Sequence, residues 1–263
     1  MEIYFHRRVG KVPAMDHPEG SMRAVYAESS QYPRYIRTDR GSTWYEENLE
    51  QKPNGLAKKW AAAKTAVIGY IPQVAHTYAV LEGMYGYMNE HQVSMGESTC
   101  AAKLYSAPIG WNDGKALFNI GELTQVGMER GKTAREAIQV MGDIATKYGF
   151  YGESWDPASI YGIPYVMGEA GEALSVIDPE EAWIFHVLPD DTGASAVWVA
   201  QRVPDHNVAV VANSFIIRHV IPDSDDFMYS DNLWEVAKRM GFWNEEEDEL
   251  MDFKLAYSPE RCS

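Results

Sequence analysis

Three side chains have the right types for thiol-based hydrolysis. A thiol nucleophile needs a base and a hydrogen-bond donor for the oxyanion, and Cys100, His91 and Asn213 supply these three types. Their spacing along the chain carries little information. A lone cysteine beside small residues is also typical of a small buried hydrophobic side chain, so both interpretations of Cys100 remain open.

An amide side chain interrupts one of the most apolar stretches of the chain. Asn213 follows the run Val-Ala-Val-Val-Ala at 208–212 and precedes Phe-Ile-Ile at 215–217. An amide inside an apolar strand costs free energy unless it is hydrogen-bonded. Asn213 therefore has either a structural partner or a functional role.

Other familiar catalytic and metal-binding patterns do not occur in the sequence. The seven histidines form no His-x-x-x-His or His-Glu-x-x-His pair, which disfavours a metal site. Residues 96–99 begin like a serine-hydrolase elbow, but Cys100 stands where the closing glycine would be. No Walker loop and no Gly-x-Gly-x-x-Gly follows a strand pattern, so we expect no nucleotide and no other cofactor.

The charge balance narrows the possible partners. Asp and Glu number 38 against 23 Lys and Arg, which leaves a net charge of -15. Such a chain cannot neutralise a phosphate backbone over a broad surface, so nucleic acid and anionic membrane are disfavoured. No apolar run has the length of a membrane span, and the first residues show no signal segment. With 46% hydrophobic residues the composition predicts one ordinary globular domain, residues 1–263, whose compartment and oligomeric state stay open.

The middle of the chain predicts strands followed by two helices. Between residues 73 and 100, short β-branched and aromatic runs broken by glycines predict two or three strands. Apolar residues then recur at helical spacing over 117–126 and again over 134–148. Thr133 and Glu136 form a capping box before the second helix, and Gly149 suits its C-cap. A helical hairpin follows from this pattern.

The later part of the chain predicts more strands. Four β-like runs cover residues 172–177, 182–188, 196–203 and 207–218, and Asp- and Pro-containing turns separate them. Short turns indicate an antiparallel meander, and a short helix is expected at 232–240. The order of strands, helix pair and strands is typical of a layered α+β fold, because each amphipathic helix can bury its apolar face on the sheet.

Several segments together resemble a known family. The sequence is similar to the secernin and dipeptidase family of cysteine-type N-terminal-nucleophile peptidases. The resemblance rests on five segments in a shared order: IPQVAHTY at 71–78, MNEHQVSMGEST at 88–99, ERGKTAREA at 129–137, DPEEAW at 178–183 and VAN at 211–213. The order from 71 to 218 is more specific than any one segment.

The resemblance implies a fold and an activity. The fold would be the four-layer αββα sandwich of N-terminal-nucleophile hydrolases. The substrates would be short peptides, dipeptides above all, and the nucleophile would be the thiol of a cysteine at the mature N-terminus. The free α-amine of that cysteine would serve as the base, since an α-amine with a pKa of about 7.7 to 8.0 is partly unprotonated at neutral pH.

The chain departs from the family pattern at the nucleophile. Residue 2 is Glu2, and no cysteine precedes Cys100. The chain also stops soon after residue 259, where family members usually continue, and residues 157–167 look like an insertion. We therefore expect an incomplete member of the family, truncated at both ends.

The resemblance also assigns candidate site residues. Asn213 would be catalytic, donating its side-chain N–H to the negative charge that develops on the scissile carbonyl oxygen. Glu97, Ser98 and Thr99 would line the same pocket and bind substrate. Glu97 would hold the α-ammonium group of the peptide, although an exposed strand-end carboxylate is an equally good interpretation of this residue.

Two other functions stay open at this level. The missing nucleophile favours a catalytically inactive scaffold that acts as a binding or interaction protein. Internal self-cleavage that exposes Ser21, Ser42 or Cys100 as a new N-terminus is a third, less favoured hypothesis.

Overall fold

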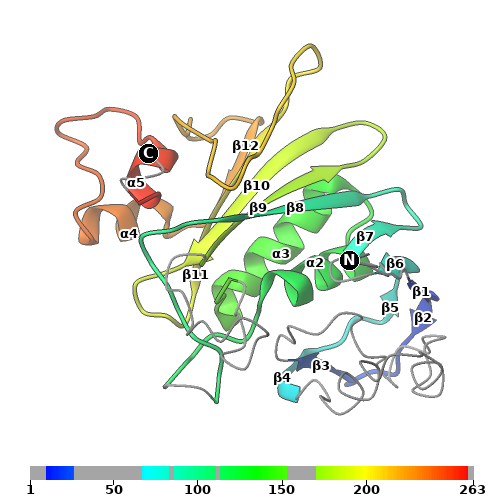
Figure 1. Ribbon diagram of the computed structural model, residues 1–263. Helices are drawn as coiled ribbons and strands as arrows, with labels where there is room; N and C mark the ends of the chain where they lie inside the picture. Colours follow the sequence, from blue (N-terminus) through cyan, green and yellow to red (C-terminus); the bar gives the residue numbers. More distant parts are fainter. Residues whose placement is uncertain (1–9, 27–66, 83–85, 111–112, 153–169, 260–263) are drawn as a thin grey trace, which may run out of the picture.

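The computed structural model describes residues 10–26, 67–82, 86–110, 113–152 and 170–259, and Figure 1 shows how their elements are arranged. Strands and helices are mixed in the α+β manner that the sequence predicts. The largest element is an eight-stranded antiparallel sheet with the order β1-β6-β7-β8-β9-β10-β11-β12. Its strands are β1 (Gly10–Val12), β6 (Val80–Glu82), β7 (Gly86–Asn89), β8 (Ser94–Cys100), β9 (Gly171–Ile177), β10 (Ala182–Pro189), β11 (Ala196–Arg202) and β12 (Phe227–Tyr229).

Two small sheets accompany the large one. The strand β2 (Met15–Asp16) pairs with β5 (His76–Thr77), and β3 (Met22–Tyr26) pairs with β4 (Val67–Pro72). The second large sheet that a four-layer αββα sandwich needs is not formed by the described residues. The structure therefore bears out the α+β class, and the four-layer arrangement remains an expectation.

Two helices cover one face of the large sheet, as Figure 1 shows in green. The helix α2 (Ile120–Arg130) begins after Asn119, whose side chain accepts the N–H of Glu122. The helix α3 (Ala134–Tyr148) begins after Thr133, whose hydroxyl accepts the N–H of Glu136 at 3.1 Å. These side chains satisfy backbone donors that have no partner within a helix, so both predicted helices and the Thr133 cap are confirmed.

Gly149 ends α3 in a conformation that few other residues adopt. Its φ is +79°, and its N–H donates to the carbonyl of Ala145. Only glycine reaches such a φ without a steric cost from a Cβ atom. The predicted C-cap at Gly149 is thus confirmed.

Alternation along the strands gives the sheet two apolar faces. One face packs on α2 and α3 and includes Leu174, Val176 and Phe185. The other face includes Ala173, Ile184 and Val199 and packs on the chain around Phe215. Neighbouring residues of a strand point to opposite faces. When both faces of the sheet are buried, the sequence of each strand is therefore apolar at nearly every position.

The second face is covered by the last part of the chain. The helices α4 (Leu233–Arg239) and α5 (Phe253–Tyr257) contribute Leu233, Val236, Phe253 and Tyr257 to the apolar cluster there. The predicted short helix at 232–240 is confirmed as α4. No helix in the described part of the chain has both the length and the apolar character needed to cross a membrane.

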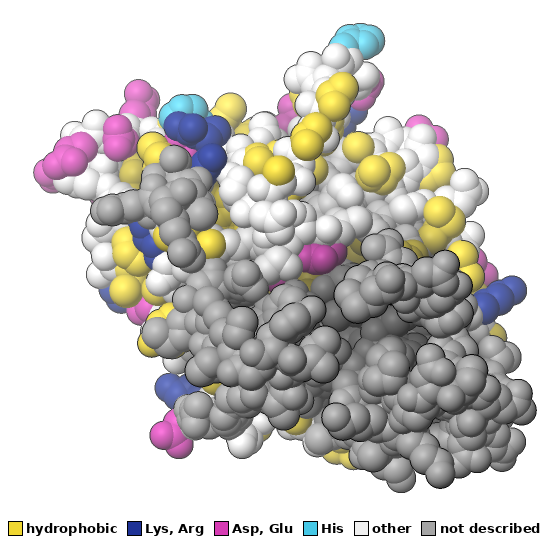
Figure 2. All heavy atoms as spheres, viewed as in Figure 1, with side chains coloured by type: hydrophobic (Ala, Val, Ile, Leu, Met, Phe, Trp, Pro, Cys, Tyr) yellow, Lys and Arg dark blue, Asp and Glu magenta, His cyan; other side chains and the backbone are white. Residues whose placement is uncertain are grey.

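The predicted strand at 207–218 is wrong. The chain there is irregular and contributes no strand to the sheet, and Val208 and Val210 are 90% and 72% exposed. The edge of β11 that a fourth run would occupy is paired with β12, through residues such as Ala200 opposite Met228. Part of residues 203–212 forms a loop that projects from the molecule, and Figure 2 shows hydrophobic side chains exposed on it.

The other expected strands of the later part are present, with boundaries shifted by at most one residue. The runs predicted at 172–177, 182–188 and 196–203 are β9, β10 and β11, and they form the expected meander. The region from 73 to 100 holds four strands rather than two or three. The insertion predicted at 157–167 lies outside the described residues.

Candidate active site

The carboxyl end of β8 carries the predicted substrate-binding residues. Ser98 lies opposite Ala173 of β9, and Thr99 lies opposite Glu172. Residues directly opposite each other in a sheet share a face. Ser98 therefore lies on the face that bears the apolar cluster of Cys100 and Phe215.

Glu97 and Thr99 lie on the opposite face from Ser98. Glu97 is opposite Leu174, a residue of the cluster that packs on α2 and α3. The Thr99 hydroxyl donates to Oε1 of Glu97 at 3.0 Å, so the two side chains meet on that face. Strand alternation thus separates the three consecutive residues that the sequence places in one pocket.

Asn213 lies against the end of β8. Its backbone N–H donates to the hydroxyl oxygen of Ser98 at 3.0 Å, and its side-chain Nδ2 donates to the carbonyl oxygen of Thr99 at 2.9 Å. The sequence places Asn213 in a buried strand, whereas the structure places it exposed on the irregular chain. The contact between Asn213 and Ser98, 115 residues apart, brings two predicted site residues together.

The backbone of Asn213 is in the left-handed region, with φ of +52°. Asparagine adopts this region more readily than most other residues that have a side chain. Such conformations concentrate at turns and at functional sites, where the surroundings hold them in place. Here the two hydrogen bonds to β8 hold the residue.

The segment that carries Asn213 is anchored by His186 of β10. The Nε2 atom of His186 accepts the N–H groups of Ile216 at 3.0 Å and of Ile217 at 3.3 Å. The imidazole is fully buried and stacks on Phe253, with ring centroids 5.9 Å apart. Because Nε2 is the acceptor, the proton of the neutral ring is assigned to Nδ1.

Burial lowers the pKa of His186 to about 3 from its ordinary value of 6.5. The apolar surroundings disfavour the charged imidazolium, so the ring stays neutral and remains an acceptor at neutral pH. His186 was not among the site residues predicted from the sequence. The signal that identified Asn213, a polar side chain inside an apolar run, also marks His186 between Phe185 and Val187.

Cys100 does not form a catalytic pair with His91. The Cys100 side chain is 1% exposed and its Sγ donates to the carbonyl of Ser98 at 3.4 Å. His91 lies in the turn before β8, and Cys100 is the last residue of β8. At about 3.3 Å per residue, the six steps from Ser94 to Cys100 alone span roughly 20 Å. The structure supports the buried, structural interpretation of Cys100.

A buried ion-pair network lies outside this region. No pattern in the sequence predicted it. Arg23 of β3 donates to Oε2 of Glu122 and to Oε2 of Glu129, both at 2.8 Å. All three side chains are at most 4% exposed. The two carboxylates stand seven residues apart on one face of α2, and the guanidinium joins that face to the β3–β4 pair.

Metal-ligating side chains do not gather within the described ranges. No group of three or more His, Cys, Asp or Glu residues there could hold a metal ion. The Ser98–Asn213 contact itself offers hydrogen bonding by an amide, a hydroxyl and backbone groups.

Comparisons with known proteins agree with the resemblance. A family model described as peptidase family C69 matches residues 79–263, which is most of the chain. A protein of Latilactobacillus sakei described as a probable dipeptidase is 31% identical over 104 residues. That match covers 39% of this chain and 17% of the relative, so the chain matches only a small part of that protein's length. The segment from β6 to the end of the chain includes β8, His186 and Asn213, and on this match the chain belongs to peptidase family C69.

Proposed function

We propose that this chain is part of a dipeptidase-type hydrolase that cleaves the peptide bond of dipeptides and other short peptides. The nucleophile is the thiol of a cysteine at a mature N-terminus encoded upstream of Met1, and the α-amine of that cysteine is the base. The completed molecule has the four-layer αββα arrangement. Support comes from membership of the C69 family and from the contact that joins Asn213 to the end of β8.

The proposed reaction is acyl transfer to sulfur. The thiol proton moves to the α-amine as sulfur bonds to the scissile carbonyl carbon, and the carbonyl oxygen takes up negative charge. When the C–N bond breaks, the proton passes to the departing amine, and water then hydrolyses the thioester. One product carries the new amine and the other carries the new carboxylate, and the enzyme regains its thiol.

Asn213 supplies the donor for the oxyanion in this proposal. An amide nitrogen carries two hydrogens, and the bond to Thr99 uses one of them. The side chain is exposed, so the second N–H is accessible to a substrate carbonyl. Removing one donor of this kind typically lowers the rate on the order of a hundredfold or more.

Ser98, Glu97 and Thr99 have different places in the proposal. The Ser98 hydroxyl accepts from the backbone of Asn213, so it positions the donor and lines the scissile bond. Glu97 and Thr99 are on the other face of β8, and they bind the α-ammonium group of a peptide that passes the end of this strand. Loss of their contacts should raise KM more than it lowers kcat.

The test compares this chain with the in-frame product that includes the sequence upstream of Met1. Both are assayed for dipeptide hydrolysis with and without a thiol alkylator. We expect activity only in the extended protein, its loss on alkylation, and full activity in Cys100→Ala. Activity in the present chain, or no activity in an extended protein that begins with cysteine, would contradict the proposal.

Asn213 is tested in the extended protein. Asn213→Ala should lower kcat on the order of a hundredfold with little change in KM, because the donor acts on charge that develops in the transition state. Glu97→Gln, one residue from the Ser98–Asn213 contact but on the other face, is the matched control and should change mainly KM. Equal kcat in Asn213→Ala and in the unaltered protein would remove the proposed oxyanion role.

A second function has one observation in its favour. The chain carries no cysteine before Cys100, and Cys100 is buried. The described part of the chain therefore offers no exposed thiol. If the sequence upstream of Met1 holds no cysteine, a binding or interaction protein built on the family scaffold becomes the preferred function.

A further inference from the structure

A small cavity lies between the helical hairpin and the β3–β4 pair. It has a volume of about 200 Å³ and is lined by Ile71 and Pro72 of β4, by Arg130 at the end of α2, and by α3 residues Asp143, Ile144, Lys147 and Tyr148. None of these residues belongs to the Ser98–Asn213 contact. We call it the Arg130 cavity.

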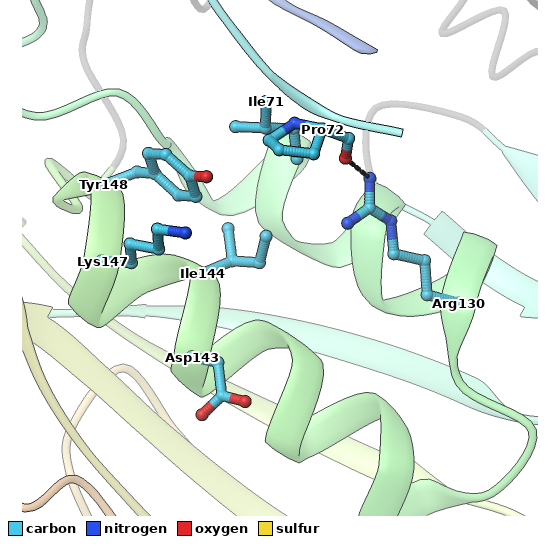
Figure 3. A pocket seen from close by; sticks show the side chains of 7 residues that line it. All are labelled: Ile71, Pro72, Arg130, Asp143, Ile144, Lys147 and Tyr148. Atoms are coloured by element: carbon cyan, nitrogen blue, oxygen red, sulfur yellow. Dashed lines mark hydrogen bonds between the residues drawn. The ribbon is translucent and has the colours of Figure 1, made fainter. Parts of the chain in front are cut away.

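Three donor groups point into the Arg130 cavity, as Figure 3 shows. One terminal nitrogen of Arg130 donates to the carbonyl oxygen of Pro72 at 3.0 Å and to Oε1 of Gln73 at 3.1 Å. The other terminal nitrogen points into the space beside Ile144. The Lys147 amine and the Tyr148 hydroxyl point toward the same space from the opposite side.

The two cations have no carboxylate partner among the described residues. The acceptors of the Arg130 guanidinium are two neutral oxygen atoms, and the neighbouring Glu129 is engaged by Arg23 at 2.8 Å. Lys147 contacts the ring of Tyr148, with Nζ 5.1 Å from the centroid, and forms no ion pair with another described residue. Cations left without a carboxylate are notable in a protein with a net charge of -15.

Partial burial makes the charged guanidinium of Arg130 less stable, so an anion bound beside it would be stabilising. Its pKa is lowered because burial disfavours the charged guanidinium, and the nearby charge of Glu129 offsets only part of this effect. Its Nε is buried and has no hydrogen-bond partner. A carboxylate accepts two parallel N–H bonds from a guanidinium, so an anionic ligand would compensate this charge better than water does.

The remaining lining defines the rest of the ligand. Pro72 and Ile144 give the lining an apolar surface between the donors, with the fully buried Ile71 behind it. An apolar cavity of about 150 Å³ accommodates benzene, so about 200 Å³ suits a carboxylate with a six-carbon body. The one carboxylate of the lining, Asp143, points away from the cavity and its Oδ1 accepts from Nε2 of Gln139 at 2.7 Å. Among the described lining residues, a ligand ammonium group would find no acid that points toward it.

We propose that the Arg130 cavity binds a small organic carboxylate that has an apolar body and lacks an ammonium group. Its carboxylate bonds to the free terminal nitrogen of Arg130 and to the Lys147 amine and Tyr148 hydroxyl, while its body packs on Pro72 and Ile144. The site is separate from the peptide-cleavage site and does not depend on it.

The experiment titrates this chain with three matched probes by calorimetry: phenylacetate, neutral phenylacetamide and phenylglycine, which adds an ammonium group. We expect phenylacetate to bind about tenfold or more tightly than either of the others. Phenylacetamide lacks the negative charge that pairs with the two cations, and phenylglycine adds an ammonium charge that finds no partner. Equal affinities for phenylacetate and phenylacetamide, or no heat from phenylacetate at millimolar concentration, would overturn the proposal. Tighter binding of inorganic phosphate than of phenylacetate would also overturn it, because the apolar surface would then contribute nothing.

Two variants locate the bound probe. Lys147→Met should weaken phenylacetate binding about tenfold and leave the melting temperature unchanged, because Lys147 is exposed and pairs with no carboxylate in the described part of the chain. Lys11→Met, at an exposed lysine outside the lining, is the matched control and should change nothing. Unchanged phenylacetate affinity in Lys147→Met would place the probe elsewhere and refute the assignment. Because binding is measured without catalysis, the result is distinguishable from a failure of the proposed hydrolase.

Discussion

The imidazole of His186 holds the backbone of Ile216 at 3.0 Å, three residues beyond Asn213. A buried neutral ring on β10 thus fixes a segment that does not form a strand of the large sheet. Two bonds at the Asn213 end, to Ser98 and Thr99, fix the same segment to β8. The position of Asn213 is therefore set by two neighbouring regions of one sheet.

The burial of His186 predicts that stability falls on acidification. The folded-state pKa of about 3 is below the ordinary 6.5, so the unfolded chain binds a proton that the folded chain does not. The stabilisation is complete above pH 6.5 and is lost as pH falls toward 3, at about 1.4 kcal/mol per pH unit. Urea unfolding of the present chain at pH 7.5 and pH 5.0 measures this loss.

The matched variant for that measurement is His186→Gln, which keeps an acceptor but does not titrate. It should show a smaller fall in the free energy of unfolding between the two pH values than the unaltered chain. An identical fall in both proteins would show that His186 is not the source of the acid sensitivity.

Arg23→Met should destabilise the chain by about 3–5 kcal/mol. The substitution removes the shared partner of Glu122 and Glu129 and leaves two buried carboxylates close together. Chemical denaturation at pH 7 tests this expectation. The triple variant Arg23→Met, Glu122→Gln, Glu129→Gln should recover part of the loss, since the two buried carboxylate charges are then absent. No recovery would mean that the lost packing of Arg23, not charge, explains the effect.

Gly142→Ala should destabilise the contact between α3 and the sheet. A Cβ atom at Gly142 would lie 2.2 Å from Cε2 of the Trp198 side chain on β11, so the helix or the indole must shift. Overpacking of this kind typically costs about 1–3 kcal/mol, which exceeds the gain of roughly 1 kcal/mol that alanine brings to a helix. A lower melting temperature than that of the unaltered chain is expected, and a higher one would show that α3 stands further from Trp198.

Cys100 should react slowly with a thiol reagent in the folded chain. Its side chain is 1% exposed and packs in the apolar cluster of the second face, where burial favours the thiol over the reactive thiolate. The measurement uses Cys262→Ser, so that Cys100 is the one thiol followed. Labelling should become fast only in denaturant, and rapid labelling without denaturant would contradict the buried position.

Local patterns in the sequence were sufficient for the elements whose signals lie within a few residues. The cap at Thr133, the glycine at Gly149 and the apolar stripes of α2 and α3 are all local hydrogen-bonding or periodic features. Three of the four later strands were predicted for the same reason, because Asp178 and Asp190 make turns by accepting nearby backbone N–H groups.

The tertiary structure alone decided which segment pairs with β11 and where the polar groups meet. Residues 208–217 are more apolar than the Phe-Met-Tyr of β12, yet β12 occupies the edge, because strand pairing depends on which segment the chain can bring alongside. Strand alternation separated Ser98 from Glu97, and contacts across the chain joined Asn213 to Ser98 and Arg23 to Glu129. Such contacts link residues on the order of a hundred positions apart, and no local period in the sequence encodes them.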